Sequence, residues 1–157
     1  IEEAQRRYAG ARTRFICSGG ENFDPQDLGQ FDAVISIGVL HHLDDAAAAQ
    51  LFATAAQVLK PDGFLATLDP AYFPGQSWLS KTLTSFDRGK FVRTPPAYAD
   101  LCASVLPHFS LRHRSNYNNF FYEGLVIYAS KTSQALEGRS RRWPSRYQQW
   151  LDSLSRP

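Results

Sequence analysis

The stretch that decides the fold is Phe31 to Asp45, which reads FDAVISIGVLHHLDD. Its central part, Ala33 to Val39, carries no charge and predicts a strand that is apolar on both faces. Such a strand suits the centre of a parallel sheet covered by helices. Because ligands bind beyond the carboxyl ends of the strands in an open sheet of this kind, we expect Gly38 to Leu43 to lie at the rim of a crevice.

The residues that follow predict a helix and a second strand. Asp44 or Asp45 can cap the helix, because both acids suit its positive N-terminal end. The helix should end at Lys60 to Gly63 (KPDG), and Phe64 to Leu68 should form the next buried strand, which stops at Asp69-Pro70. Together they form a right-handed crossover unit of an α/β sheet. The expected buried face of the helix repeats at helical spacing: Ala48, Leu51, Phe52, Ala55, Val58 and Leu59.

The flanking segments predict further elements of the same domain. A helix remnant at Ile1 to Tyr8 and a short strand at Arg14 to Cys17 precede the central unit, and the segment from Ala71 to Thr94 is irregular. Beyond it, the pattern predicts a helix and an antiparallel strand pair, followed by a basic tail with an apolar helical stripe. These last elements span residues 95–106, 109–117, 124–130 and 132–157, and the stripe comprises Tyr147, Trp150, Leu151 and Leu154.

Composition favours one globular domain. The chain has 157 residues, of which 43% are hydrophobic and 20% charged, and its net charge of +2 is too small to indicate nucleic-acid binding. No apolar run approaches the roughly 18 residues of a membrane span. Cys17 and Cys102 predict buried free thiols in a reducing cytoplasm. Because the chain contains no methionine and opens within a helical pattern, we expect it to be part of a longer protein.

The central motifs resemble those of the class I S-adenosylmethionine-dependent methyltransferases. FDAVISIGVLHHL resembles the family's fourth strand and its end, and VLKPDGFLATLDP resembles the approach to the fifth strand. The resemblance extends over roughly residues 1–130 and is most specific between Phe31 and Pro70. It implies a Rossmann-like three-layer α/β sandwich, mostly parallel, with an antiparallel C-terminal hairpin. The family's first two strands and glycine-rich loop are absent from this chain.

The resemblance also implies a cofactor, S-adenosylmethionine, and part of its binding site. The implied contacts are Gly19, Gly20 and Glu21 beside the adenine, Ile37 and Gly38 at the end of the fourth strand, and His42 nearby. Gly19 stands where the family usually has an acidic residue, and Glu21 follows two places later. The acid that holds the ribose belongs to the absent second strand.

His41 and His42 are the candidate catalytic residues, because histidine can accept a proton from a methyl acceptor near neutral pH. The alternative is that one of them packs against the next helix while the other borders the cofactor. Adjacent residues are expected to point in different directions, so the sequence predicts no joint metal site.

Four further residues are candidates for binding the acceptor. Asp69 could orient it or finish the strand before Pro70, and Tyr72 could line a pocket or cover the core. Arg88 and Arg93 could hold a carboxylate or phosphate, although charged loop residues are more often solvated. Tail arginines and aromatic residues raise the alternative of RNA, but a helix docked on the domain is the stronger interpretation.

The missing strands have a structural consequence. In the family the sheet order is 3-2-1-4-5-7-6, so without strands one and two the Arg14–Cys17 strand has no neighbour and the Ala33–Val39 strand loses one. Exposed backbone edges tend to recruit another chain. The sequence therefore predicts either a longer parent protein or a homo-oligomer formed through the open edge.

The resulting hypothesis is a partial methyltransferase domain at residues 1–130 with a basic tail at 131–157. It would act in the cytoplasm on a small-molecule acceptor by direct methyl transfer, and the fragment alone would be inactive. A non-catalytic scaffold with the same fold is an alternative, because Gly19 replaces an acid. A nicotinamide-dependent dehydrogenase is disfavoured by the antiparallel C-terminal strands. Neither a membrane nor nucleic acid is expected as a partner.

Overall fold

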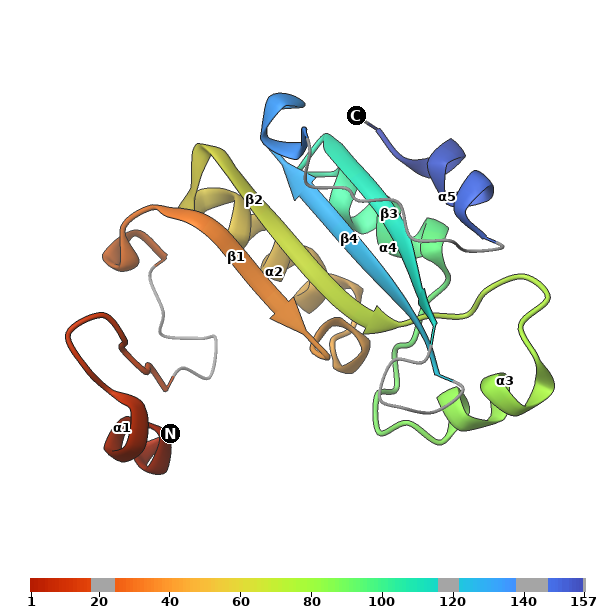
Figure 1. The fold of residues 1–157 in the computed structure, drawn as a ribbon, viewed down its shortest axis with the longest axis horizontal. Coiled ribbons are helices and arrows are strands. Elements are labelled where there is room, and N and C mark those ends of the chain that lie inside the picture. The colour runs from red at the N-terminus through yellow and green to blue at the C-terminus, as the bar shows by residue number, and fades with distance from the viewer. Residues whose placement is uncertain (18–24, 116–121, 138–146, 157) are drawn as a thin grey trace.

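The fold is built around one mixed sheet (Figure 1). The computed structural model describes residues 1–17, 25–115, 122–137 and 147–156, without the side chains of residues 26 and 27. The described strands are β1 (Phe31–Ile37), β2 (Leu59–Pro70), β3 (His108–Ser115) and β4 (Glu123–Ser130), in the spatial order β1-β2-β4-β3. β1 and β2 are parallel, whereas β4 runs antiparallel to both β2 and β3.

This order matches the half of the family sheet that the sequence predicts. If β1 and β2 are the fourth and fifth strands, β4 and β3 take the places of the seventh and sixth, which gives 4-5-7-6. The expected Rossmann-like α/β class and the antiparallel C-terminal pair are therefore confirmed.

The crossover between β1 and β2 forms as predicted, with one change. Helix α2 (Asp45–Val58) begins after Asp44, whose carboxylate accepts a hydrogen bond of 2.9 Å from the backbone N–H of Ala47. The helix ends at Val58 rather than at KPDG, and β2 starts directly at Leu59. The register is irregular there, because Phe31 pairs with Leu59 whereas Ala33 already pairs with Phe64. The KPDG residues form an irregularity inside the strand instead of a separate turn.

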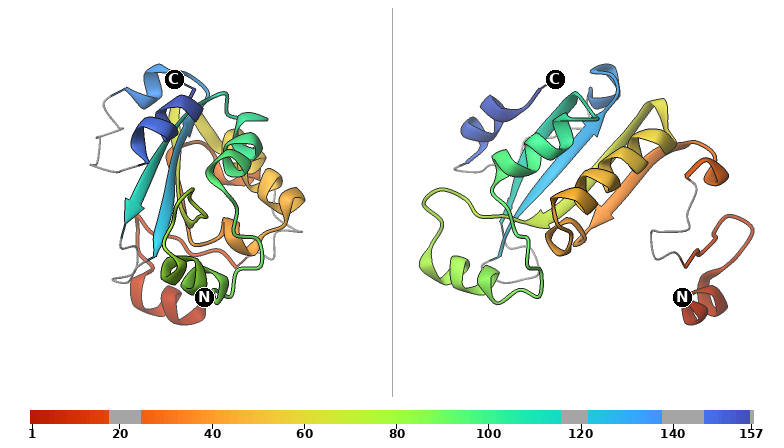
Figure 2. Two further views of the ribbon diagram at one scale, coloured as in Figure 1. Left: turned by 90° about the vertical axis from the view of Figure 1, so that its right-hand side faces the viewer. Right: turned by 180° about the vertical axis from the view of Figure 1, so that it is seen from behind.

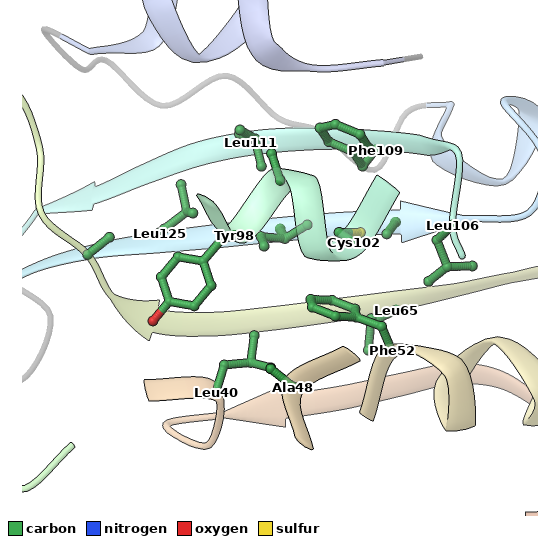
Figure 3. Packing of buried hydrophobic residues seen from close by; sticks show 14 of the residues in the cluster. Leu40, Ala48, Phe52, Leu65, Tyr98, Cys102, Leu106, Phe109, Leu111 and Leu125 are labelled. Atoms are coloured by element: carbon green, nitrogen blue, oxygen red, sulfur yellow. The ribbon is translucent and has the colours of Figure 1, made fainter. Parts of the chain in front are cut away.

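Helices α2 and α4 (Pro95–Ala103) cover one face of the sheet, as the side and rear views show (Figure 2). Their apolar side chains meet those of alternate strand residues in one core (Figure 3). Burial raises the pKa of the Cys102 thiol to about 12, which suits an inert core position. Fully buried members of this core include Leu40, Phe52, Leu65, Tyr98, Cys102, Leu106, Leu111 and Leu151.

The C-terminal segment docks on the outer side of β3. Helix α5 (Gln148–Leu154) buries Leu151, and Trp150 and Leu154 pack against the core, so the predicted apolar stripe is confirmed. Beyond the helix, the backbone N–H of Arg156 donates a 2.8 Å hydrogen bond to the carbonyl of Phe109. The carbonyl of Arg156 in turn accepts from the N–H of Phe109. This exchange covers part of the outer edge of β3.

Three sequence predictions are wrong in detail. Arg14 to Cys17 forms no strand, because no described strand lies beside it, and Cys17 is exposed rather than buried. The irregular segment contains a helix, α3 (Trp78–Ser85), which Ser77 caps by accepting a hydrogen bond from the N–H of Ser80. The predicted first helix, by contrast, is confirmed as α1 (Glu2–Tyr8), which buries none of its side chains.

The opposite face of the sheet carries no α-helix that the structure describes (Figures 1 and 2). Side chains on this face come from directly paired strand positions, which point to the same side. Ile35 and Ile37 on β1 are 66% and 60% exposed, respectively. β1 also pairs with β2 alone among the described strands, so its other edge is open. The bare face comprises Ile35, Ile37, Ala66, Leu68, Val126 and Tyr128.

Candidate functional site

The carboxyl end of β1 turns sharply into the rim that the sequence predicts. Gly38 adopts a positive φ of 66°, which favours glycine, and its N–H donates a 2.9 Å hydrogen bond to the carbonyl of Leu68. The 3-10 turn η2 (Leu40–His42) follows and buries Leu40 and His41. His42 is exposed. The rim therefore presents one histidine to solvent and encloses the other.

His41 lies between two carboxylates. Its Nδ1 is 2.8 Å from Oδ1 of Asp69 at the end of β2, and the same oxygen accepts a 3.2 Å hydrogen bond from the backbone N–H of His41. Its Nε2 is 3.3 Å from Oδ1 of Asp87. With 5% of its surface exposed, His41 is a fixed and enclosed ring.

The segment 86–91, which we call the strap, covers His41. A Cβ added to Gly89 would lie 2.0 Å from Cδ2 and 2.6 Å from the carbonyl oxygen of His41, so only glycine fits there. The N–H of Phe91 donates a 3.0 Å hydrogen bond to that same carbonyl. Asp87 is held in turn by the N–H of Gly89 at 2.9 Å and by the hydroxyl of Tyr122 at 3.2 Å. The strap is thus anchored on both sides of the imidazole.

Arg93 ties the strap, η2 and the start of α2 together. All its donors contact protein acceptors: Nε donates to Asp45, Nη1 to the carbonyls of Leu40 and Phe91, and Nη2 to the carbonyl of Leu43 and to Asp45. The guanidinium N–H groups are therefore occupied by the protein itself.

The two histidine rings lie together. Their centroids are 4.0 Å apart with an interplanar angle of 40°. The sequence expectation that adjacent side chains diverge is therefore wrong, because the tight η2 turn does not separate them as an extended strand would.

A polar hollow of about 340 Å³ lies beside the strap. Thr84 is 1% exposed, and its hydroxyl has no described hydrogen-bond partner. Burial and the neighbouring Asp87 carboxylate raise the pKa of Tyr122 above its ordinary value. The hollow is lined by Tyr72, Thr84, Ser85, Asp87, Gly89, Lys90 and Val92.

The structure brings together only some of the residues predicted for the site. His41, His42 and Asp69 meet at the rim, and Tyr72 lines the adjacent hollow. Ile37 points to the bare face, and Arg88 is exposed on the strap. Gly19, Gly20 and Glu21 lie outside the described residues.

Sequence reasoning missed the roles of Asp87, Gly89 and Tyr122. Asp87 and Gly89 reach His41 only through tertiary folding, from a segment without apolar periodicity, and Tyr122 contacts Asp87 from the residue before β4. The glycine at position 89 was the available signal, since a glycine in a charged loop can mark close approach of another group.

None of the helices in the described part of the chain is long and apolar enough to cross a bilayer. The family described as a methyltransferase domain matches residues 1–63. No curated protein sequence is similar enough to count as a match.

Several solved structures share the fold. The structure of LaPhzM is 17% identical with a TM-score of 0.59, and the match covers 82% of this chain and 38% of that one. Human N-acetylserotonin methyltransferase, solved in complex with SAM, is 20% identical with a TM-score of 0.50 and is matched over 70% of this chain and 32% of its own. An O-methyltransferase family protein from Burkholderia thailandensis is 20% identical with a TM-score of 0.50, with coverages of 69% and 33%. The chain spans about a third of the length of these proteins.

Proposed function

We propose that this chain, which has the class I methyltransferase fold and matches the methyltransferase domain family over residues 1–63, forms part of an S-adenosylmethionine-dependent methyltransferase for a small-molecule acceptor. The observation that carries the proposal is the rim at the end of β1, where an exposed histidine adjoins a fixed one beside a polar hollow. In open α/β sheets this edge is the one that binds ligands.

Some of the described residues are suited to form part of the cofactor-binding site. Ile37 offers an exposed apolar side chain at the end of β1, and Gly38 lets a ligand approach the backbone closely. We propose that these residues and His42 contact the cofactor, together with Gly19, Gly20 and Glu21. When bound, the cofactor supplies a sulfonium methyl group that is already electrophilic.

The chain's own residues would then align the acceptor and remove its proton. His42 is the better candidate for the proton acceptor, because its ring is exposed whereas His41 is enclosed by Asp69 and the strap. We assign His41 a positioning role: its ring lies against that of His42 and limits the directions that ring can take. Arg93 positions the same turn, because its N–H groups donate hydrogen bonds to the carbonyls of Leu40 and Leu43.

The acceptor would occupy the hollow beside the strap. Its lining offers hydroxyl groups from Tyr72, Thr84 and Ser85 and one cation, Lys90, which suits a small acceptor with several polar groups. The exposed Arg88 is placed to attract an anionic acceptor without contacting the fixed ring. The structural similarity to human N-acetylserotonin methyltransferase supports a small-molecule acceptor.

Calorimetry with S-adenosylhomocysteine on the intact protein tests this proposal. Saturable binding is expected, and the His42→Ala variant should lower the methyl-transfer rate by about 10²–10⁴-fold, the range of general-base catalysis. Replacement of the exposed Asp100 on α4 by Asn serves as the control and should change neither quantity. Absence of binding would favour the scaffold alternative instead.

Two further expectations belong to the same proposal. The open edge of β1 and the bare face suggest that the chain of residues 1–157 forms a homo-oligomer. We also propose a cytoplasmic location, because the exposed Cys17 and the buried Cys102 are both free thiols, as expected in a reducing compartment. Residues 1–130 would form the partial catalytic domain and 131–157 its tail.

A further inference from the structure

We propose that His41, His42 and Asp87 form a binding site for a divalent transition-metal ion, with Zn²⁺ as the best match. Each of the three residues offers one ligand atom, and these atoms lie within 4.8 Å of one another. Two imidazoles and a carboxylate are a ligand set that suits zinc and its neighbours better than Mg²⁺ or Ca²⁺.

The separation of two of the three proposed ligand atoms agrees with a shared ion. Nε2 of His41 and Oδ1 of Asp87 are 3.3 Å apart. Two ligand atoms of a tetrahedral zinc site are about 3.3 Å apart when each bond to the metal is about 2.0 Å long. The same separation is longer than the usual N–H···O hydrogen bond of about 2.9 Å. The pair is therefore spaced as joint ligands are.

The site is held in place by a second layer of contacts. Asp69, only 2.8 Å from Nδ1 of His41, fixes the tautomer that leaves Nε2 free to face Asp87. A carboxylate behind a ligating histidine is the usual support of zinc sites. Asp87 is oriented by the N–H of Gly89 and by the Tyr122 hydroxyl, so two of the three ligands are fixed before any ion binds.

The local charge also favours a cation. Asp69 and Asp87 both contact one imidazole, and Oδ2 of Asp69 is buried without a described hydrogen-bond partner. A neutral imidazole has one N–H and can donate to only one of the two carboxylates. An ion between Nε2 and Asp87 would leave the Nδ1–H for Asp69 and would offset the second negative charge.

The remaining coordination position would be accessible. His42 is exposed, and Asp87 and Gly89 also line the polar hollow, so water or an oxygen of a small ligand can reach the ion. A metal-bound His42 can no longer accept a proton. The ion should therefore inhibit methyl transfer in proportion to its occupancy, although the site itself is defined by binding and does not depend on the proposed activity.

The test is a titration of the intact protein with Co²⁺, followed by visible absorption, and with Zn²⁺, followed by calorimetry. We expect one ion per chain. The His42→Ala and Asp87→Asn variants should each bind it at least about 10-fold more weakly than the unaltered protein does. Asp69→Asn should weaken binding about 10–100-fold, as loss of a supporting carboxylate does. Asp100→Asn, a change of the same kind at an exposed acid on α4, should bind as the unaltered protein does.

His42→Ala is informative even if Asp87→Asn impairs folding, because His42 is exposed. Thermal melts in the absence of metal check the fold of each variant. Absence of saturable binding would overturn the proposal. Binding that His42→Ala leaves unchanged, or that Asp100→Asn weakens equally, would overturn it as well.

Discussion

His41 is confined from three sides, and this confinement explains one otherwise unremarkable glycine. Asp69 and Asp87 flank its ring, and Gly89 lies directly against it. Because part of the contact is with the backbone carbonyl of His41, a larger residue at position 89 cannot be accommodated by rotating one side chain. The close packing of the strap on the η2 turn therefore requires a residue without a Cβ at position 89.

Gly89→Ala should lower the free energy of unfolding by about 1–3 kcal/mol, the usual cost of overpacking. The added methyl group must displace either the strap or the η2 turn. Chemical denaturation monitored by circular dichroism measures the change. Gly10→Ala is the matched control, since nothing lies within 4 Å of a Cβ at that position. Equal stability of the two variants would contradict the described contact.

At this scale the sequence predicted the positions of His41, His42 and Asp69 but not their relations. The HHL motif after an apolar strand places both histidines at the sheet rim. Which of them is enclosed depends on Asp87 and Gly89, and no local pattern links these residues to the motif. The same holds for Arg93, whose acceptors are mostly backbone carbonyls and leave no trace in the sequence.

At the scale of elements, Arg93 joins three of them: the strap, η2 and α2. Arg93→Lys should lower the free energy of unfolding by about 2 kcal/mol or more. Lysine keeps the charge but has one nitrogen, so it cannot reach Leu40, Leu43 and Asp45 together. Thermal unfolding is the measurement.

The exposed Arg88 provides the matched control for that substitution. Arg88→Lys should leave the unfolding temperature unchanged. If both variants melt alike, the contacts of Arg93 contribute little to holding the three elements, and its assignment as a positioning residue fails.

Elements with a strong period were predictable, and those that depend on a missing neighbour were not. The repeat in α2 specifies a buried face, and the strongly apolar run of β4 specifies a buried strand, so these elements appear close to the expected bounds. The Arg14–Cys17 strand fails because a strand needs a partner for its backbone groups. Helix α3 was overlooked because its buried residues, Ser80 and Thr84, are polar, whereas its Trp78 is exposed, and only Ser77 marked its start.

At the scale of the whole molecule, the α-helices that the structure describes cover one face of the sheet and leave Ile35 and Ile37 exposed on the other. The exposed apolar side chains of β1 should then bind another apolar surface. For the chain of residues 1–157 we expect a homo-oligomer that Ile35→Lys shifts toward monomer, because a charge on the bare face must be desolvated when that face is covered. Sedimentation velocity measures the shift.

Val105→Lys is the control, because Val105 is also a partly exposed apolar residue but lies just after α4, away from the bare face. It should leave the oligomeric state unchanged. The expectation would be contradicted if the unaltered chain were monomeric. It would also be contradicted if Ile35→Lys left the oligomeric state unchanged.

The exchange of hydrogen bonds between Arg156 and Phe109 makes the two outer edges of the sheet differ in their capacity to pair with another strand. Among the described strands, part of the outer edge of β3 is covered at Phe109 by the backbone of Arg156, whereas the outer edge of β1 can still accept a strand. If two copies paired through their β1 strands, the open β1 edge of each would be hydrogen-bonded to the other. The partly covered β3 edges would then lie at the two ends of the combined sheet. Such a pair is a closed, two-fold assembly rather than the first step of a fibre.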